Sequence, residues 1–383
     1  MQVTRVEEEG MSGRKITISL LIGGLLFTGC SKKENTLFTI TDDQPITLES
    51  IDKKDITELM SDSESYTYLD AIDFYGCFND DQAYYGYAID RVTSIQSVMY
   101  LDFSTGNYEM IYKASDANAT ITLLGLKSNN FVYQVLNDDN LSIRLYNTKT
   151  KEDKEIINGE GSSMNIDSTV DILEDELYFS MYDKETDHYI IYHYDIKDDL
   201  LEKMISKENR NCSNPVVIDK KIYYLSINNS ELSVEFVEYN MESKQEKVLY
   251  ETKQTEENKG LYISALYKQG NQIYLQTLSS EKAIMYEVNL QNKQLKPIIE
   301  SDSFDMFRMN DQYMTWGAAS TSPNRVRRQY YLYDYKNNMN YVNSDGYVSL
   351  GNQKIVWNKY LKSDEAIPKG EVNSNENTII QVE

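Results

Sequence analysis

The residues best suited to binding a charged ligand are three arginines in one short segment. Arg325, Arg327 and Arg328 close the segment Trp316-Gly-Ala-Ala-Ser-Thr-Ser-Pro-Asn-Arg325-Val-Arg327-Arg328, the one dense basic cluster in a chain of formal net charge −23. Guanidinium groups bind carboxylates and phosphates through paired hydrogen bonds, and an indole offers a stacking face. We predict a ligand-binding site at these four residues. Alternatively, the arginines pair with acidic neighbours.

The chain has few residues for chemistry that depends on histidine. The chain has two histidines, and His193 lies between Tyr192 and Tyr194 as expected of a packing residue in a strand. A histidine-rich metal site is therefore excluded, and the motifs GxSxG, HExxH and GxxxxGK[ST] do not occur. We predict no catalytic and no metal-binding residues. His188 is kept as a candidate ligand-binding residue because it occupies the loop of another repeat equivalent to the arginine segment.

Carboxylates are abundant, with 61 Asp and Glu residues. Such acidity repels nucleic acid and anionic lipid head groups. It predicts no cofactor and at most weak Ca²⁺ binding, because no EF-hand type loop occurs. A pair of carboxylates could serve a glycosidase or lyase, although no pair stands out. We therefore favour a binding function over an enzymatic one.

An apolar stretch precedes the first cysteine. Residues 16–27 are apolar, follow Arg14 and Lys15, and are too few to span a bilayer as a helix. They have the length and flanks of a signal peptide. Residues 1–10 are acidic, unlike the start of a signal peptide, so we expect Met11 to be the true start.

The end of this stretch, Phe27-Thr28-Gly29-Cys30, resembles the lipobox of bacterial lipoproteins, with Phe27 at a position where leucine is usual. The resemblance implies cleavage between Gly29 and Cys30 and a diacylglycerol on the Cys30 sulfur. We expect an extracytoplasmic protein anchored by lipid at the cell surface. The two other cysteines, Cys77 and Cys212, could pair, but we favour unpaired thiols, because so long a chain can bury a core without a disulfide.

The rest of the chain is built from an internal repeat. An apolar-aromatic strand ends in Asp or Asn at intervals of 45, 48, 45, 49 and 45 residues, at positions Asp102, Asn147, Asp195, Asn240, Asn289 and Asp334. Each is followed by a polar turn and another strand. A second hairpin precedes each copy, with a turn rich in Asp, Asn and Gly, residues that suit tight turns.

Two hairpins make four antiparallel strands in 40–50 residues, the unit of a β-propeller blade. Six copies run from about Tyr66 to Ser344, and residues 347–357 and 378–382 form a partial seventh. We predict an all-β propeller of seven blades, with six as the alternative, whose last blade is completed by the strand at residues 36–40. Residues 49–65 read as a linker or short helix on the rim. The predicted domains are 1–29 (signal peptide), 30–65 (tether, closing strand and linker) and 66–383 (propeller).

The Ile-Tyr-Tyr and Tyr-Asp/Asn repeats resemble bacterial propeller lipoproteins related to TolB-like and YWTD-type propellers, although no Tyr-Trp-Thr-Asp occurs. The resemblance implies a binding or scaffolding domain with a protein or envelope glycan as partner. In propellers, ligands are often held at the channel mouth, beside the loops that join the second and third strands. We therefore expect the arginine segment at that mouth.

Overall fold

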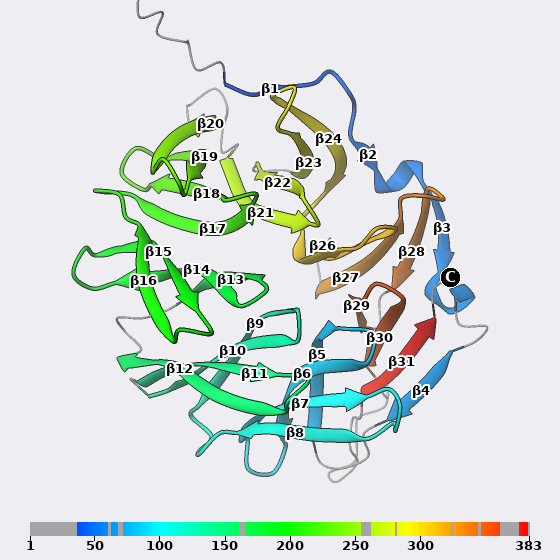
Figure 1. Ribbon diagram of the computed structural model, residues 1–383. Coiled ribbons are helices and arrows are strands. Elements are labelled where there is room, and N and C mark those ends of the chain that lie inside the picture. The colour runs from blue at the N-terminus through cyan, green and yellow to red at the C-terminus, as the bar shows by residue number, and fades with distance from the viewer. Residues whose placement is uncertain are drawn as a thin grey trace, which may run out of the picture. The chain divides into compact units, whose positions relative to one another are not determined.

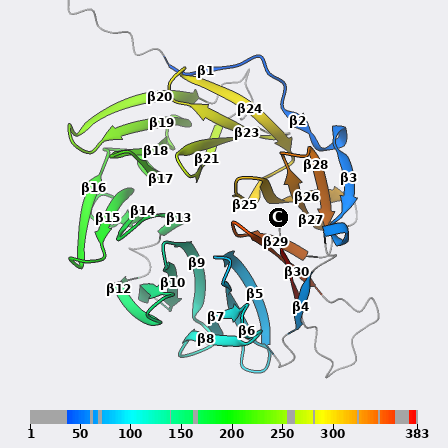
Figure 2. The ribbon, with the colours of Figure 1, turned by 45° about the vertical axis from the view of Figure 1, so that its right-hand side comes forward.

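The described residues form seven sheets, each built on four antiparallel strands and two of them extended at the outer edge by short parallel strands, arranged as the blades of a β-propeller (Figures 1 and 2). This computed structural model describes residues 37–59, 63–67, 72–138, 140–160, 166–253, 262–279, 282–322, 325–343, 346–360 and 375–381. Helix is confined there to two short 3₁₀ turns, Leu48–Ser50 and Ile56–Leu59. None of the described residues forms a helix long and apolar enough to cross a bilayer. The predicted seven-bladed propeller is confirmed.

The first four blades follow the chain without interruption. Blade 1 contains β5 (Ile72–Asn79), β6 (Ala83–Asp90), β7 (Gln96–Asp102) and β8 (Tyr108–Lys113). Blade 2 contains β9 (Thr120–Lys127), β10 (Asn130–Asn137), β11 (Asn140–Asn147) and β12 (Glu152–Glu160). Blade 3 contains β13 (Ile166–Leu173), β14 (Glu176–Asp183), β15 (His188–Asp195) and β16 (Leu200–Ile205). Blade 4 contains β17 (Asn211–Ile218), β18 (Lys221–Asn228), β19 (Ser233–Asn240) and β20 (Gln245–Lys253).

The remaining blades also receive strands from the N-terminal part of the chain. Blade 5 contains β21 (Tyr262–Gln269), β22 (Gln272–Leu278), β23 (Ala283–Asn289) and β24 (Gln294–Ser301), with β1 (Thr39–Ile40) and β2 (Ile46–Thr47) beside β24. Blade 6 contains β25 (Asp305–Met309), β26 (Tyr313–Ser322), β27 (Arg325–Asp334) and β28 (Met339–Asn343), with β3 (Asp52–Asp55) beside β28. Blade 7 contains β29 (Gly346–Leu350), β30 (Lys354–Tyr360), β31 (Asn375–Gln381) and β4 (Glu64–Thr67).

The ring is closed by β4, which pairs antiparallel with β31 as the outermost strand of blade 7. An N-terminal strand does complete the last blade, but the expected segment, residues 36–40, was wrong. Within it, β1 pairs parallel with β24 of blade 5. Its apolar character has another cause, because Phe38 is buried in the core shared by blades 4 and 5. The Phe38 ring meets that of Phe236 edge-on at 6.4 Å.

Residues 37–59 form a strap along the outer rim of blades 5 and 6 (Figure 2). Residues 49–65 were expected to be a linker or a short helix, and the 3₁₀ turn Ile56–Leu59 lies within them, whereas the strands β3 and β4 were not expected there. Ile51 and Ile56 are buried, which anchors the strap to the blades. The weak apolar pattern of this segment therefore reflects docking onto strand edges.

The repeated Asp or Asn residues stabilise the hairpins that join the third and fourth strands. In Asp102, the Oδ1 atom accepts hydrogen bonds from the backbone N–H of Ser104 (2.8 Å) and Thr105 (3.2 Å). Asn147, Asp195, Asn240, Asn289 and Asp334 make the same pair of bonds. Either residue type suits this turn because both carry the accepting oxygen. This shared requirement produces the repeat seen in the sequence.

Tyrosines pack between blades while their hydroxyl groups reach polar partners. Tyr133 is fully buried, and its hydroxyl donates to Asp153 at 2.9 Å. Such residues provide large apolar area without leaving a buried hydroxyl unsatisfied. Cys77 and Cys212 are both free, as favoured from the sequence. Burial raises the pKa of the Cys212 thiol to about 12.

Candidate functional site

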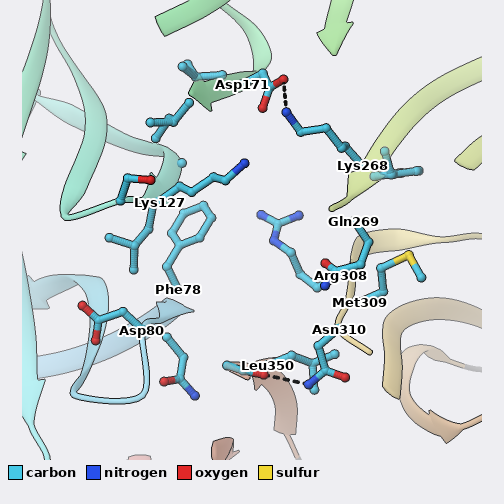
Figure 3. A pocket seen from close by; sticks show the side chains of 18 of the residues that line it. Phe78, Asp80, Lys127, Asp171, Lys268, Gln269, Arg308, Met309, Asn310 and Leu350 are labelled. Atoms are coloured by element: carbon cyan, nitrogen blue, oxygen red, sulfur yellow. Dashed lines mark hydrogen bonds and ion pairs between the residues drawn. The ribbon is translucent and has the colours of Figure 1, made fainter. Parts of the chain in front are cut away.

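A cavity of about 630 Å³ occupies one end of the central channel. All seven innermost strands line it, near the turns that join the first and second strands (Figure 3). Its volume lies within the range of small-molecule sites in proteins. Among the described residues, the lining has three basic side chains, Lys127, Lys268 and Arg308, and two acidic ones, Asp80 and Asp171.

The rim of this cavity is held by hydrogen bonds between neighbouring turns. Asn310 of blade 6 donates from Nδ2 to the carbonyl of Gly351 in blade 7 at 2.7 Å. The Asp81 carboxylate of blade 1 accepts from the backbone N–H of Gln353 (2.8 Å) and Lys354 (2.9 Å) of blade 7. Turns fixed in this way present a defined rather than adaptable opening.

Lys268 and Asp171 form a buried ion pair on the wall of the cavity. Each side chain is 9% exposed, and the Lys268 ammonium also donates to the carbonyl of Val217 at 3.1 Å. Burial lowers the pKa of Lys268, Asp171 opposes this shift, and the positive charge of Lys127 adds to it. The two opposite charges therefore compensate each other, and the Lys268 ammonium is less available to an anionic ligand.

Arg308 is fixed against blade 1 and directed into the cavity (Figure 3). Its guanidinium carbon lies 5.0 Å from the centre of the Phe78 ring, a cation–π contact. Its Nη1 donates to the carbonyl of Phe307 at 2.8 Å. No described carboxylate forms an ion pair with it. Since a guanidinium has five N–H donors, others stay available to a ligand.

Lys127 projects into the cavity from the side opposite Arg308 (Figure 3). Its side chain is exposed, and within the described part of the chain it too lacks an ion-pair partner. Around these two cations, exposed neutral side chains form the rim: Gln82, Ser128, Asn129 and Asn352. The lining thus combines two cations that have no described ion-pair partner with neutral groups that can both donate and accept hydrogen bonds.

The two carboxylates of the described lining make structural hydrogen bonds and an ion pair. Asp171 is paired with Lys268 and accepts the N–H of Val217 at 2.7 Å. Asp80 accepts the N–H groups of Gln82 (3.0 Å) and Ala83 (2.8 Å) within its turn. A general base or nucleophile must be free to reach the substrate. In this structure both carboxylates are held by other groups of the protein.

Trp316, predicted to stack on a ligand, packs inside the protein instead. It is 1% exposed, its ring stacks on that of Tyr331 at 5.3 Å, and its Nε1 donates to Ser301 at 3.0 Å. The sequence pattern did not reveal this, because a tryptophan beside glycine and alanine suits either a loop or a strand between blades. The indole is a core residue.

The arginines lie in a hairpin and not in a loop. Arg325, Arg327 and Arg328 belong to β27, where they pair with Ser322, Ser320 and Ala319 of β26. His188 begins β15 and pairs with Asp183, at the corresponding hairpin of blade 3. These hairpins join second and third strands, whereas the cavity lies at the turns between first and second strands, the opposite end from the one expected. Ligand binding by these four residues stays a prediction.

The cavity cations share a position that the repeat analysis could have identified. Lys127, Lys268 and Arg308 each lie one or two residues before the turn between the first and second strands of their blades. The equivalent positions of other blades hold apolar residues such as Ile172 and Val217. A basic residue at the inner end of a first strand was the available signal. The lipid-site residues Gly29 and Cys30 lie outside the described part of the chain.

No protein-family model and no curated protein matches the chain. Its structure is similar to that of an oligogalacturonate lyase solved with manganese, with a TM-score of 0.56 and 11% identity over 84% of this chain and 97% of that one. The β-propeller domain of the Trilobed protease from Pyrococcus furiosus gives a TM-score of 0.52 and 13% identity, covering 76% of this chain and 91% of that one.

TolB from Acinetobacter baumannii gives a TM-score of 0.44 and 12% identity, covering 64% of this chain and 58% of that one. The similarities to the oligogalacturonate lyase and to the propeller domain of the Trilobed protease, at such low identity, establish the propeller fold alone. A propeller of the general kind expected from the repeats is thus supported, while a YWTD-type relationship and the lipid anchor stay predictions. Among the described residues, no group of three His, Cys, Asp or Glu is placed to hold a metal ion.

Proposed function

We propose that this protein is a lipid-anchored, extracytoplasmic binding protein that takes part of a partner protein or an envelope glycan into the mouth of its propeller channel. The observation that carries the proposal is the cavity on which all seven blades converge. A channel mouth of this size, with a fixed rim and with two cations that point into it, is suited to holding a ligand. The lipobox-like sequence before Cys30 supports the anchor.

Binding is favoured over catalysis by the state of the carboxylates. The alternative, a carbohydrate-active enzyme such as a glycosidase or lyase, needs acidic groups free to act on the substrate. Asp80 and Asp171 are the acidic residues of the described lining. Asp80 accepts hydrogen bonds within its turn, and Asp171 forms an ion pair with Lys268. The similarity to an oligogalacturonate lyase lies at 11% identity and transfers no activity.

The proposal is tested by affinity capture from solubilised native membranes, with the lipidated full chain as bait and mass spectrometry as the readout. In one variant, Gln269→Trp places a bulky ring in the cavity lining. Its matched control is Gln291→Trp, at an exposed turn of the same blade. A third variant reverses the charges of Arg325, Arg327 and Arg328.

We expect Gln269→Trp to lose the captured partner and Gln291→Trp to retain it. Loss with the arginine variant alone would place the interface at the opposite end of the channel and contradict the cavity assignment. Turnover of a glycan panel by the full chain would contradict the binding function and favour the enzyme.

A further inference from the structure

We propose that the ligand group recognised in the cavity is the carboxylate of an acidic sugar, held between Arg308 and Lys127. This inference rests on the proposed binding function and specifies its ligand class. Both cations point into the cavity from opposite walls (Figure 3). A carboxylate between them would gain charge-assisted hydrogen bonds from a guanidinium and an ammonium group.

The requirement for an anion follows from the two uncompensated charges. In a chain of net charge −23, acidic partners are plentiful, and the other basic wall residue, Lys268, has one in Asp171. Arg308 and Lys127 face the cavity with no ion pair to any described carboxylate. Two cations that point into the same cavity repel each other, and an anion between them removes this repulsion.

The charge balance favours one carboxylate over a more highly charged group. Three basic and two acidic side chains give the described lining a net charge of +1. A single carboxylate neutralises this charge, whereas a phosphate dianion would exceed it. The acidic exterior also repels a polyanion more strongly than a singly charged ligand.

The rim favours a sugar over a peptide. Gln82, Ser128, Asn129 and Asn352 are exposed, neutral and able both to donate and to accept hydrogen bonds. Sugar hydroxyl groups have the same dual character and are well matched by amides and hydroxyls. Many peptides are instead recognised through apolar side chains placed in apolar pockets, which these four polar rim residues do not form.

The experiment uses the full chain in detergent and isothermal titration calorimetry. The probes are hexuronate-containing disaccharides and their carboxyl-reduced, neutral counterparts, with inorganic phosphate and an N-acetyl dipeptide acid as further arms. We expect a hexuronate disaccharide to bind at least about tenfold more tightly than its neutral counterpart. Added salt should weaken its binding.

The variants are Arg308→Gln and Lys127→Gln, each with an expected loss of about tenfold or more in hexuronate affinity. Lys149→Gln is the matched control, because it removes one positive charge at an exposed turn outside the cavity. Lys127 is exposed, so its variant tests the site even if Arg308→Gln weakens the fold.

Equal binding of the acidic and neutral sugars would overturn the carboxylate assignment while leaving glycan binding intact. If the dipeptide acid or phosphate binds and the hexuronate disaccharides do not, the sugar assignment is overturned. If no probe binds but Gln269→Trp still abolishes capture of a membrane partner, this inference fails and the proposed function survives. If that capture is also insensitive to Gln269→Trp, both fail.

Discussion

The Lys268 ammonium of blade 5 reaches past blade 4 to the Asp171 carboxylate of blade 3. The two side chains enclose Val217 of the intervening blade, whose N–H donates to Asp171 at 2.7 Å and whose carbonyl accepts from Lys268 at 3.1 Å. One buried ion pair thus links three blades at the wall of the channel. Its contribution can be measured separately from ligand binding.

Asp171→Asn should strongly destabilise the protein, because it leaves a 9% exposed ammonium without its counter-ion. We expect a loss of about 3 kcal/mol in the free energy of unfolding, measured by urea denaturation at neutral pH. Burial already lowers the pKa of Lys268, and Asp171 is the group that opposes this. A lysine with a lowered folded pKa destabilises the protein in full below that pKa, and the penalty is lost as the pH rises from there towards the unfolded value, so the deficit should shrink over this range.

The control for this prediction is Glu242→Gln, which removes an ion pair to Lys220 whose side chains are 67% and 73% exposed. A solvated pair of this kind contributes little, and we expect no measurable loss in the free energy of unfolding. Equal losses in the two variants would show that burial of the Lys268–Asp171 pair has no special effect.

The turn role of Asp102 predicts that its accepting oxygen matters more than its charge. Asp102→Asn should lower the free energy of unfolding at neutral pH by much less than Asp102→Ala, which should lower it by about 1 kcal/mol, both measured by urea denaturation. Hydrogen bonds from Ser104 and Thr105 lower the pKa of Asp102 from 3.8. The resulting stability is present above that value and is lost as the pH falls through the folded pKa, so Asp102→Asn should lose less stability in acid. An alanine variant as stable as the wild type would contradict this role.

Ring closure by β4 predicts that a disulfide between β4 and β31 stabilises the propeller. Ser65 and Thr378 are cross-strand partners, and their hydroxyl oxygens lie 3.0 Å apart. In the Ser65→Cys/Thr378→Cys variant, oxidation should raise the melting temperature relative to the reduced form, because the crosslink restricts the unfolded chain. The single-cysteine variants serve as controls and should show no such rise. An unchanged melting temperature after verified crosslinking would argue against closure at this edge.

The lipid anchor predicts that Cys30→Ser releases the protein from the membrane. Without its thiol the residue cannot carry a diacylglycerol, and a single polar tether gives no other membrane attachment. We expect loss of radiolabelled fatty acid and recovery of the protein in the soluble fraction after cell fractionation. Cys77→Ser is the matched control and should stay with the membrane. A membrane-bound Cys30→Ser protein would contradict lipid anchoring at this residue.

The repeat could be recognised in the sequence because its causes are local. Asp102 and Asn147 each accept backbone N–H groups two and three residues ahead, so the requirement is contained in one turn. Counting these turns and the strands between them favoured seven blades, with six as the alternative.

What the sequence by itself determined was therefore the repeating unit, a β-propeller for which seven blades were favoured over six, and the acidic character of the chain. Only the tertiary structure decided that β4 closes the ring, that Trp316 is buried, and that Lys127 and Arg308 face each other across a cavity at the other end of the channel. Each of these results depends on contacts between segments that lie far apart in the chain. A basic residue at the end of a first strand can be located in the sequence. Which of these residues face one another is decided only when the blades form the ring.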